Sequence, residues 1–395
     1  MTEGMPGVRM SAPFWSVGFR SFFWLGALNA VASMATWVAF LSGIAIGSQG
    51  WPPHSLHAHE MLHGTVVPAI AGFLLTAVPN WCGTAPLRGA PIGGLVALWL
   101  VGRAALASAS ILPPEAVALL DGAFLPVLGM VVGVPILRSG KRRNLPIVLV
   151  IFALAIANGA MHVGIMRADA SLLRAGLYGS VYLVVFLNLV IAGRVVPLFT
   201  RNALRRSGLD FAVQGDRRIG ALALGAAGFA LAFDLAIPGS SVGGFAALAA
   251  APLLALRQGL WKPRYTLGQP MLWILHVGHG WIAIGFACHA AAVLTQVLPA
   301  SAALHSFTAG AMGSMILGMM TRVSLGHSGR PVEASNITIA SFAAVVFAAL
   351  VRVFGPGLMP LHVLPVFLAS GAAFVVGYLL FAIEFTPLLW RARID

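Results

Sequence analysis

Long apolar runs constrain the fold of this chain more than any other feature of its sequence. An α-helix needs about 20 apolar residues to cross the hydrocarbon core of a bilayer. Between Met61 and Leu87, for example, no Asp, Glu, Lys or Arg appears. Runs of this kind predict about twelve transmembrane helices, at residues 20–46, 57–79, 91–111, 115–137, 145–167, 171–198, 219–236, 241–257, 269–297, 300–322, 334–354 and 361–389.

The composition indicates the same class of protein. Hydrophobic residues make up 59% of the 395 residues, charged residues only 9%, and the mean hydropathy is +0.91. Soluble globular domains carry about 25% charged residues. The loops between the runs are short, so we expect one integral membrane domain over residues 1–395, with a short cytoplasmic tail at residues 1–19. The predicted fold class is an all-α, polytopic membrane helical bundle.

The net charge of +13 would suggest nucleic acid as the partner of a soluble protein. Here the positive charges follow the predicted loops instead. Twenty of the 24 Lys and Arg residues fall at the termini and on alternate loops, and the remaining four are Arg103, Arg167, Arg174 and Arg352. By the positive-inside rule both termini are cytoplasmic. We therefore expect the lipid bilayer as a partner and no nucleic acid.

The second run begins with His57-Ala-His-Glu-Met-Leu-His63. His59 and His63 are four residues apart and share one face of a helix, and His57 precedes them at the entry. Imidazole is the commonest metal ligand, and ionisable side chains inside membrane spans default to a functional role. The sequence therefore predicts a ligand site at one end of this helix.

A rise of ~1.5 Å per residue places most histidines at one of two depths. An outer layer, toward the extracytoplasmic side, contains His59, His63, His162, His289 and His305. The loops or span edges beyond it hold His54, His57 and His362. A single intramembrane histidine is usually a polar contact between helices. Five at one depth favour a histidine-rich copper site or a haem with two axial imidazoles.

An inner layer, toward the cytoplasm, contains His276 and His279, one helical turn apart. His327 follows in the segment TRVSLGHSGRP. Three arginines are predicted on the same side: Arg194, Arg322 and Arg330. Imidazole beside guanidinium is suited to ligating haem iron and pairing with the propionates. The alternative is that the arginines only follow the positive-inside rule and that His327 is a solvated loop residue.

His59-Glu60-Met61-Leu62-His63 also matches the HExxH motif of zinc proteases. The pair Asp121-Gly122 resembles an element of intramembrane proteases. We keep an intramembrane zinc protease as a remote alternative, because HExxH has only three fixed positions. Asp121 is more generally a buried acid that could relay protons or orient a ligand.

Several stretches together resemble the NnrS family. The matching stretches are HAHEMLHG and AGFLLTAVPNW (residues 57–81), GRVVPLFTRNAL (193–204), LHVGHGWIAIG (275–285) and LHSFTAGAMGSMILGMMTRVSLGHSGRP (304–331). They are spread over nearly the whole chain, in the right order. The resemblance implies a multispan protein of the bacterial cytoplasmic membrane that carries haem and copper in the nitric oxide response.

The resemblance assigns roles to individual residues. Family motif positions fall on His57, His59, His276, His305, His327, Glu60, Arg194, Arg322 and Arg330. His63 stands where the family usually has an aromatic residue, and His279 where it often has Tyr. These departures weaken the assignment of His63 and His279 as ligands, and they weaken the HExxH interpretation.

The resemblance implies a b-type haem and copper, with His57, His59 and His305 as outer ligands and His276 with His327 as inner ligands. His63 is a further candidate ligand, and Glu60 and Asp121 are expected to support the ligands. The implied role is nitric oxide metabolism or resistance to nitrosative stress, with a respiratory electron donor as a candidate partner. An oxidoreductase acting on nitric oxide, a protein that only binds it, a proton- or metal-coupled transporter and a metal-delivery factor for respiratory enzymes all stay open.

Overall fold

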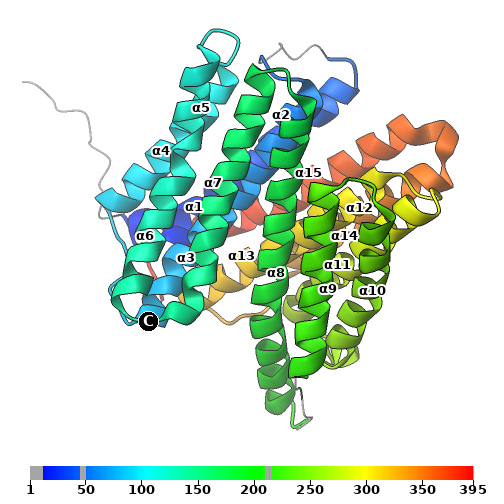
Figure 1. Cartoon of the computed structure of the whole chain (residues 1–395). Coiled ribbons are helices and arrows are strands. Elements are labelled where there is room, and N and C mark those ends of the chain that lie inside the picture. Colours follow the sequence, from blue (N-terminus) through cyan, green and yellow to red (C-terminus); the bar gives the residue numbers. More distant parts are fainter. Residues whose placement is uncertain (1–11, 45–49, 210–212, 214–215, 395) are drawn as a thin grey trace, which may run out of the picture.

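The computed structural model describes residues 12–44, 50–209, 213 and 216–394, and over these residues it is a bundle of helices without strands (Figure 1). Most of the predicted tail at residues 1–19 lies outside the described residues. The elements are η1 (Pro13–Trp15), α1 (Gly18–Leu41), α2 (Pro53–His59), η2 (Glu60–Val66), α3 (Val67–Cys82), α4 (Ala90–Ala107), α5 (Pro114–Gly122), α6 (Phe124–Arg138), η3 (Arg142–Asn144), α7 (Leu145–Met166), α8 (Ala170–Arg206), α9 (Arg217–Ala236), α10 (Ser241–Gly259), η4 (Pro263–Thr266), α11 (Pro270–Leu294), α12 (Ala300–His305), η5 (Ser306–Met312), α13 (Gly313–His327), α14 (Asn336–Leu358), η6 (Pro360–His362) and α15 (Val363–Trp390).

The predicted membrane bundle is confirmed. Within the described part of the chain, eleven helical stretches are long and apolar enough to cross a membrane. The run predicted at residues 300–322 forms a continuous helical stretch from α12 through η5 to α13. The chain is therefore a multi-pass membrane protein with about twelve spans.

Local sequence explains where many of these helices begin. Asp169, Asp216, Ser240 and Ser335 cap the starts of α8, α9, α10 and α14, each accepting a hydrogen bond from a backbone N–H of the first turn. Proline occupies the first turn of α2, α4, α5, α7 and α11, where its missing N–H costs nothing.

Two of the spans contain a π-helical segment. The first, η2, follows directly after His59, and the second, η5, follows directly after His305. Turns of this kind are rare and often lie at functional sites. Both segments thus begin at histidines that the sequence identifies as candidate ligands.

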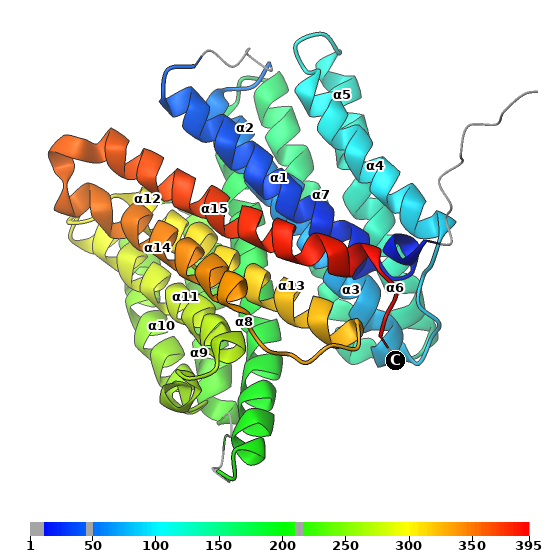
Figure 2. The same ribbon diagram turned by 180° about the vertical axis from the view of Figure 1, so that it is seen from behind.

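The two ends of the described chain lie together. The ring of Phe14 stacks on Trp390 with centroids 4.2 Å apart, and the Arg20 guanidinium donates to the carbonyl of Leu389 at 3.1 Å. Figure 2 shows α1, α15 and α14 running side by side and tilted against α8. Both ends are therefore on the same side of the bundle, as an even number of spans requires. That this side is the cytoplasm stays a prediction.

Close packing of α7 on α8 depends on Gly176. A Cβ atom at Gly176 would lie 2.6 Å from the carbonyl oxygen of Ala157 and 2.7 Å from the backbone nitrogen of Met161. Backbone atoms cannot move aside without shifting α7. The same stretch of α7 carries Asn158 and His162, so this contact also positions polar side chains inside the bundle.

We expect Gly176→Ala to destabilise the protein by ~1–3 kcal/mol, the range typical of overpacking. Gly225→Ala in α9 is the matched control, because no atom lies within 4 Å of its added Cβ. Gly225→Ala should leave the stability unchanged or raise it by up to ~1 kcal/mol, since alanine is more favourable than glycine inside a helix. Thermal unfolding of both variants in one detergent measures the difference, and equal midpoints would contradict the expectation.

Candidate metal centre

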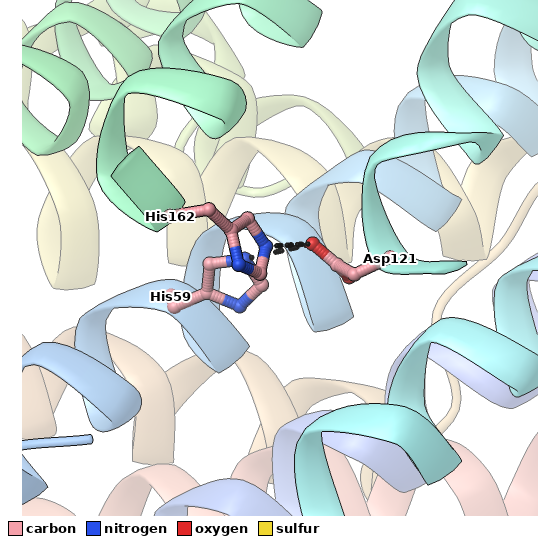
Figure 3. Close-up of side chains that lie close together, drawn as sticks. All are labelled: His59, Asp121 and His162. Atoms are coloured by element: carbon pink, nitrogen blue, oxygen red, sulfur yellow. Dashed lines mark hydrogen bonds and ion pairs between the residues drawn. The ribbon is translucent and has the colours of Figure 1, made fainter. Parts of the chain in front are cut away.

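Three buried side chains from three helices converge at the outer layer. His59 ends α2, Asp121 lies in α5 and His162 in α7, and all three are at most 4% exposed. Oδ2 of Asp121 lies 3.1 Å from Nε2 of His59 and 2.8 Å from Nε2 of His162. Figure 3 shows the two rings and the carboxylate turned toward one another. We call these three residues the metal group.

Asn158, Arg103 and Glu60 extend the metal group into a larger polar network. The Asn158 amide donates to Oδ2 of Asp121 at 2.8 Å, and its oxygen lies 2.9 Å from Nε2 of His59. Arg103 forms ion pairs with both Asp121 and Glu60. Glu60 in turn lies 3.3 Å from Nδ1 of His59. The network therefore fixes the rings and the carboxylate from several directions.

The charges in this network do not cancel without a further positive charge. Arg103 offsets one of the two carboxylates, Glu60 and Asp121, and all three lie at buried or half-buried positions. A buried unpaired carboxylate is costly. A proton on a histidine or a metal ion between the histidines would supply the missing charge.

The geometry of the metal group suits a metal ion. The three donor atoms lie within 4.8 Å of one another. Ligand bonds of ~2.0–2.1 Å in a tetrahedral site place donor atoms ~3.3 Å apart, close to the two separations above. Two imidazole nitrogens and one carboxylate oxygen form a donor set suited to Cu(II), Zn(II) or Fe(II).

His63 lies next to the metal group with one nitrogen free. Its ring centroid is 4.8 Å from that of His59, and its Nε2 lies 3.3 Å from the Ser180 hydroxyl. Its Nδ1 is buried without a hydrogen-bond partner. A void of about 10 Å³, enough for roughly one water molecule, is lined by His63, Asp121, Asn158 and Arg103. The void could thus hold one small molecule on the side of the group that faces His63.

A larger cavity of about 380 Å³ adjoins the network. Its lining includes Trp37, Trp51, His57, Glu60 and Arg103. The rings of Trp37 and His57 stack at 4.6 Å. Trp51 also contacts the rings of His59 and His162 edge-on, each at 5.1 Å, so it separates the cavity from the metal group.

His305 and Arg352 lie near His57. The three side chains are close enough to interact electrostatically. Nδ1 of His305 donates to the carbonyl oxygen of Ser301 at 2.8 Å. Metal-bound histidines commonly make such a bond, which leaves the other ring nitrogen as the ligand atom.

The candidate ligands of the inner layer do not converge in the same way. His276 is buried against Thr200, with 3.0 Å between Nε2 and the hydroxyl, and His279 donates to Gln258 at 2.9 Å. His327 is exposed and lies against Phe19 with centroids 5.8 Å apart. Across the described part of the chain, the metal group is where three candidate metal-ligating side chains meet.

The three arginines predicted on the inner side also lie in different surroundings. Arg194 is exposed, and the Arg322 guanidinium lies over the ring of Phe199 at 4.0 Å. Arg330 keeps a buried Nη1 without a hydrogen-bond partner. A haem at the inner layer therefore stays a prediction that no group of contacts supports.

Sequence reasoning placed His162 in the outer layer but did not choose it as a site residue, and it gave Asp121 only a supporting role. The structure makes both potential direct ligands. Asn158 and Arg103 were also missed as site residues. Both could have been recognised from the sequence. Asn158 and His162 are one helical turn apart in an otherwise apolar run, and Arg103 is a charged residue inside a predicted span.

The comparisons with known proteins agree with the resemblance seen in the motifs. No curated protein matches this chain. The NnrS protein family matches residues 13–393, which is nearly the whole chain. The chain therefore belongs to the NnrS family, and it is in general terms a membrane protein of the nitric oxide response.

Proposed function

We propose that this protein holds copper at the metal group and a b-type haem at the adjoining cavity, and that it acts in nitric oxide metabolism or in resistance to nitrosative stress. We place it in the bacterial cytoplasmic membrane. The observation that carries the proposal is the convergence of His59, Asp121 and His162 in a buried group beside a cavity.

The copper assignment is supported by the donor set and by the local charge. His59 and His162 would supply imidazole nitrogens, and Asp121 a carboxylate oxygen. The buried, unpartnered Nδ1 of His63 is available as a fourth donor. Copper bound there would supply a redox-active ion that can exchange an electron with a nearby ligand.

The haem assignment is supported by two histidines. His57 lines the larger cavity and has a buried Nδ1 without a partner. His305 lies near His57 and has its Nδ1 held by a carbonyl. Arg352, which lies near His57, could pair with a propionate. A volume of about 380 Å³ lies at the lower end of the ~300–1,000 Å³ typical of ligand sites.

The protein's own residues would organise both groups. Glu60 holds the ring of His59 through Nδ1, which leaves Nε2 for the metal, and Arg103 holds the carboxylate of Asp121. Trp51 keeps the metal group apart from the cavity. Burial excludes bulk water, and the small void beside His63 admits a ligand no larger than a diatomic gas or water.

The same contacts favour this proposal over the rival functions. Glu60 is paired with Arg103, so it is not free to activate water as the base of an HExxH protease. A transporter or metal-delivery factor must release its ion, whereas these donors are buried and held by ion pairs. A bound redox centre fits such a site better than an exchanging ion.

The test is an optical spectrum of the purified protein, oxidised and reduced, together with haem and copper analysis. We expect a Soret band that shifts on reduction and again on addition of nitric oxide. His57→Ala and His305→Ala should each lower haem content at least ~10-fold, the lower end of the effect seen even for residues that only support a ligand.

His362→Ala is the control, because this histidine is exposed in the outer loop before α15. It should keep the haem content of the unmodified protein. A colourless protein after expression with ample haem would overturn the haem assignment. Copper that is bound but lost on brief dialysis would favour metal delivery or transport.

A further inference from the structure

A second polar cavity, of about 280 Å³, lies among α8, α9, α11 and α12, which Figure 1 shows as neighbours. None of the residues of the metal group lines it. Its polar lining includes Arg174, Tyr178, Tyr182, Asp234 and His289. This volume corresponds to about nine water molecules at ~30 Å³ each, enough for a substituted six-membered ring.

Asp234 anchors one wall of this cavity. It is 4% exposed and lies near the end of α9. The Tyr182 hydroxyl donates to its Oδ2 at 2.6 Å, and the Arg174 guanidinium lies 3.4 Å from the same oxygen. Because both signs of charge face the cavity, an ion of either sign would meet repulsion as well as attraction. The wall suits a neutral ligand with both donor and acceptor groups.

His289 faces this wall with an unused nitrogen. Its Nε2 lies 3.6 Å from Oδ1 of Asp234, which is too long for a hydrogen bond. This nitrogen is buried and has no hydrogen-bond partner. Buried polar atoms are almost always bonded, so an unpaired one beside a cavity indicates a ligand.

The remaining lining suits a flat ring. Tyr178, Tyr182 and Phe307 line the cavity, and the Arg174 guanidinium lies 4.3 Å from the Tyr178 ring centroid. Ile237 and Val297, each close in sequence to a lining residue, are 55% and 77% exposed. Apolar side chains exposed at the ends of spans are suited to contact with lipid. A ligand here could therefore extend an apolar tail into the bilayer.

We propose that this cavity binds the ring of a lipid-soluble quinone or quinol. His289 and Arg174 would hydrogen-bond to a ring oxygen, and the carboxylate of Asp234 would accept from a ring hydroxyl. The proposal goes beyond the copper and haem assignments and does not depend on either group being present.

The test is binding of durohydroquinone, the quinol form of duroquinone, to the purified protein in lipid nanodiscs, measured by isothermal titration calorimetry without oxygen. Durene, the same ring without the two hydroxyls, is the matched ligand. Durohydroquinone should saturate at one per protein, whereas durene should give only unsaturable partitioning into lipid. Asp234→Asn and His289→Leu should each weaken durohydroquinone binding about tenfold or more, as expected for lost bonds to buried polar groups.

Tyr182→Phe and Tyr378→Phe form a matched pair of variants. Each removes one buried hydroxyl, but that of Tyr378 bonds to the carbonyl of Gly313 outside this cavity. Only Tyr182→Phe should weaken binding. Gel-filtration profiles and thermal unfolding midpoints identify any variant that fails to fold. Absence of saturable binding, or equal binding by the unmodified protein and the Asp234 and His289 variants, would overturn the proposal.

Discussion

Replacing His162 with alanine is expected to strip copper from the protein while leaving it inserted in the membrane. The change removes one of three convergent donors and leaves only His59, Asp121 and the neighbouring His63. Loss of a residue that merely supports a ligand already costs ~10–100-fold in metal affinity, so loss of a ligand should cost at least ~100-fold. Copper per protein, measured by mass spectrometry after desalting, gives the result.

His289→Ala is the control for this measurement. His289 belongs to the same outer layer, but it lies beside Asp234 rather than Asp121. Its variant should retain full copper content. If the His162 variant also retains copper, the metal group is only a structural polar network and the copper site lies elsewhere.

Replacing Arg103 with methionine is expected to destabilise the protein by about 3–5 kcal/mol, the usual result of removing one partner from a buried ion pair. Glu60 and Asp121 would both remain at buried or half-buried positions without their cation. Methionine fills much of the same volume, so the effect is chiefly electrostatic. Thermal unfolding in detergent, followed by circular dichroism, compares the variant with the unmodified protein.

Two further variants separate charge from packing. The double variant Arg103→Met with Glu60→Gln should be more stable than Arg103→Met alone, because it lacks one of the two unpaired carboxylates. Arg138→Met, at the exposed end of α6, should leave the stability nearly unchanged. An Arg103 variant as stable as the Arg138 variant would mean that the network contributes little to folding.

The sequence determined the membrane bundle and, within a few residues, most of its spans. Hydropathy is enough to predict a span, because the ability of a helix to cross a bilayer depends on its own length and composition. The ends of the spans were less well predicted. The run expected at residues 171–198 is α8, Ala170–Arg206, and the run expected at residues 300–322 continues to His327. Helices can continue beyond their apolar part, and in α13 the Arg322 guanidinium packs over Phe199.

The sequence also determined where ligand chemistry was to be sought. The segment from His57 to His63 and the common depth of five histidines both indicated the outer layer. They could not indicate which histidines meet. The spans are apolar on most faces, so their periodicity does not fix the rotation of one helix against another.

Only the tertiary structure decided that His162 meets His59 at Asp121, whereas His289, in the same layer, lies beside Asp234. It also showed that Asp121 is a potential ligand rather than only a supporting residue, and that Arg103 forms an ion pair with its carboxylate. The physical reason is that contacts between spans arise from helix rotation and close approach, as at Gly176, and these depend on packing across the whole bundle. Local sequence encodes the depth of a side chain in the membrane, but the packed fold encodes its partners.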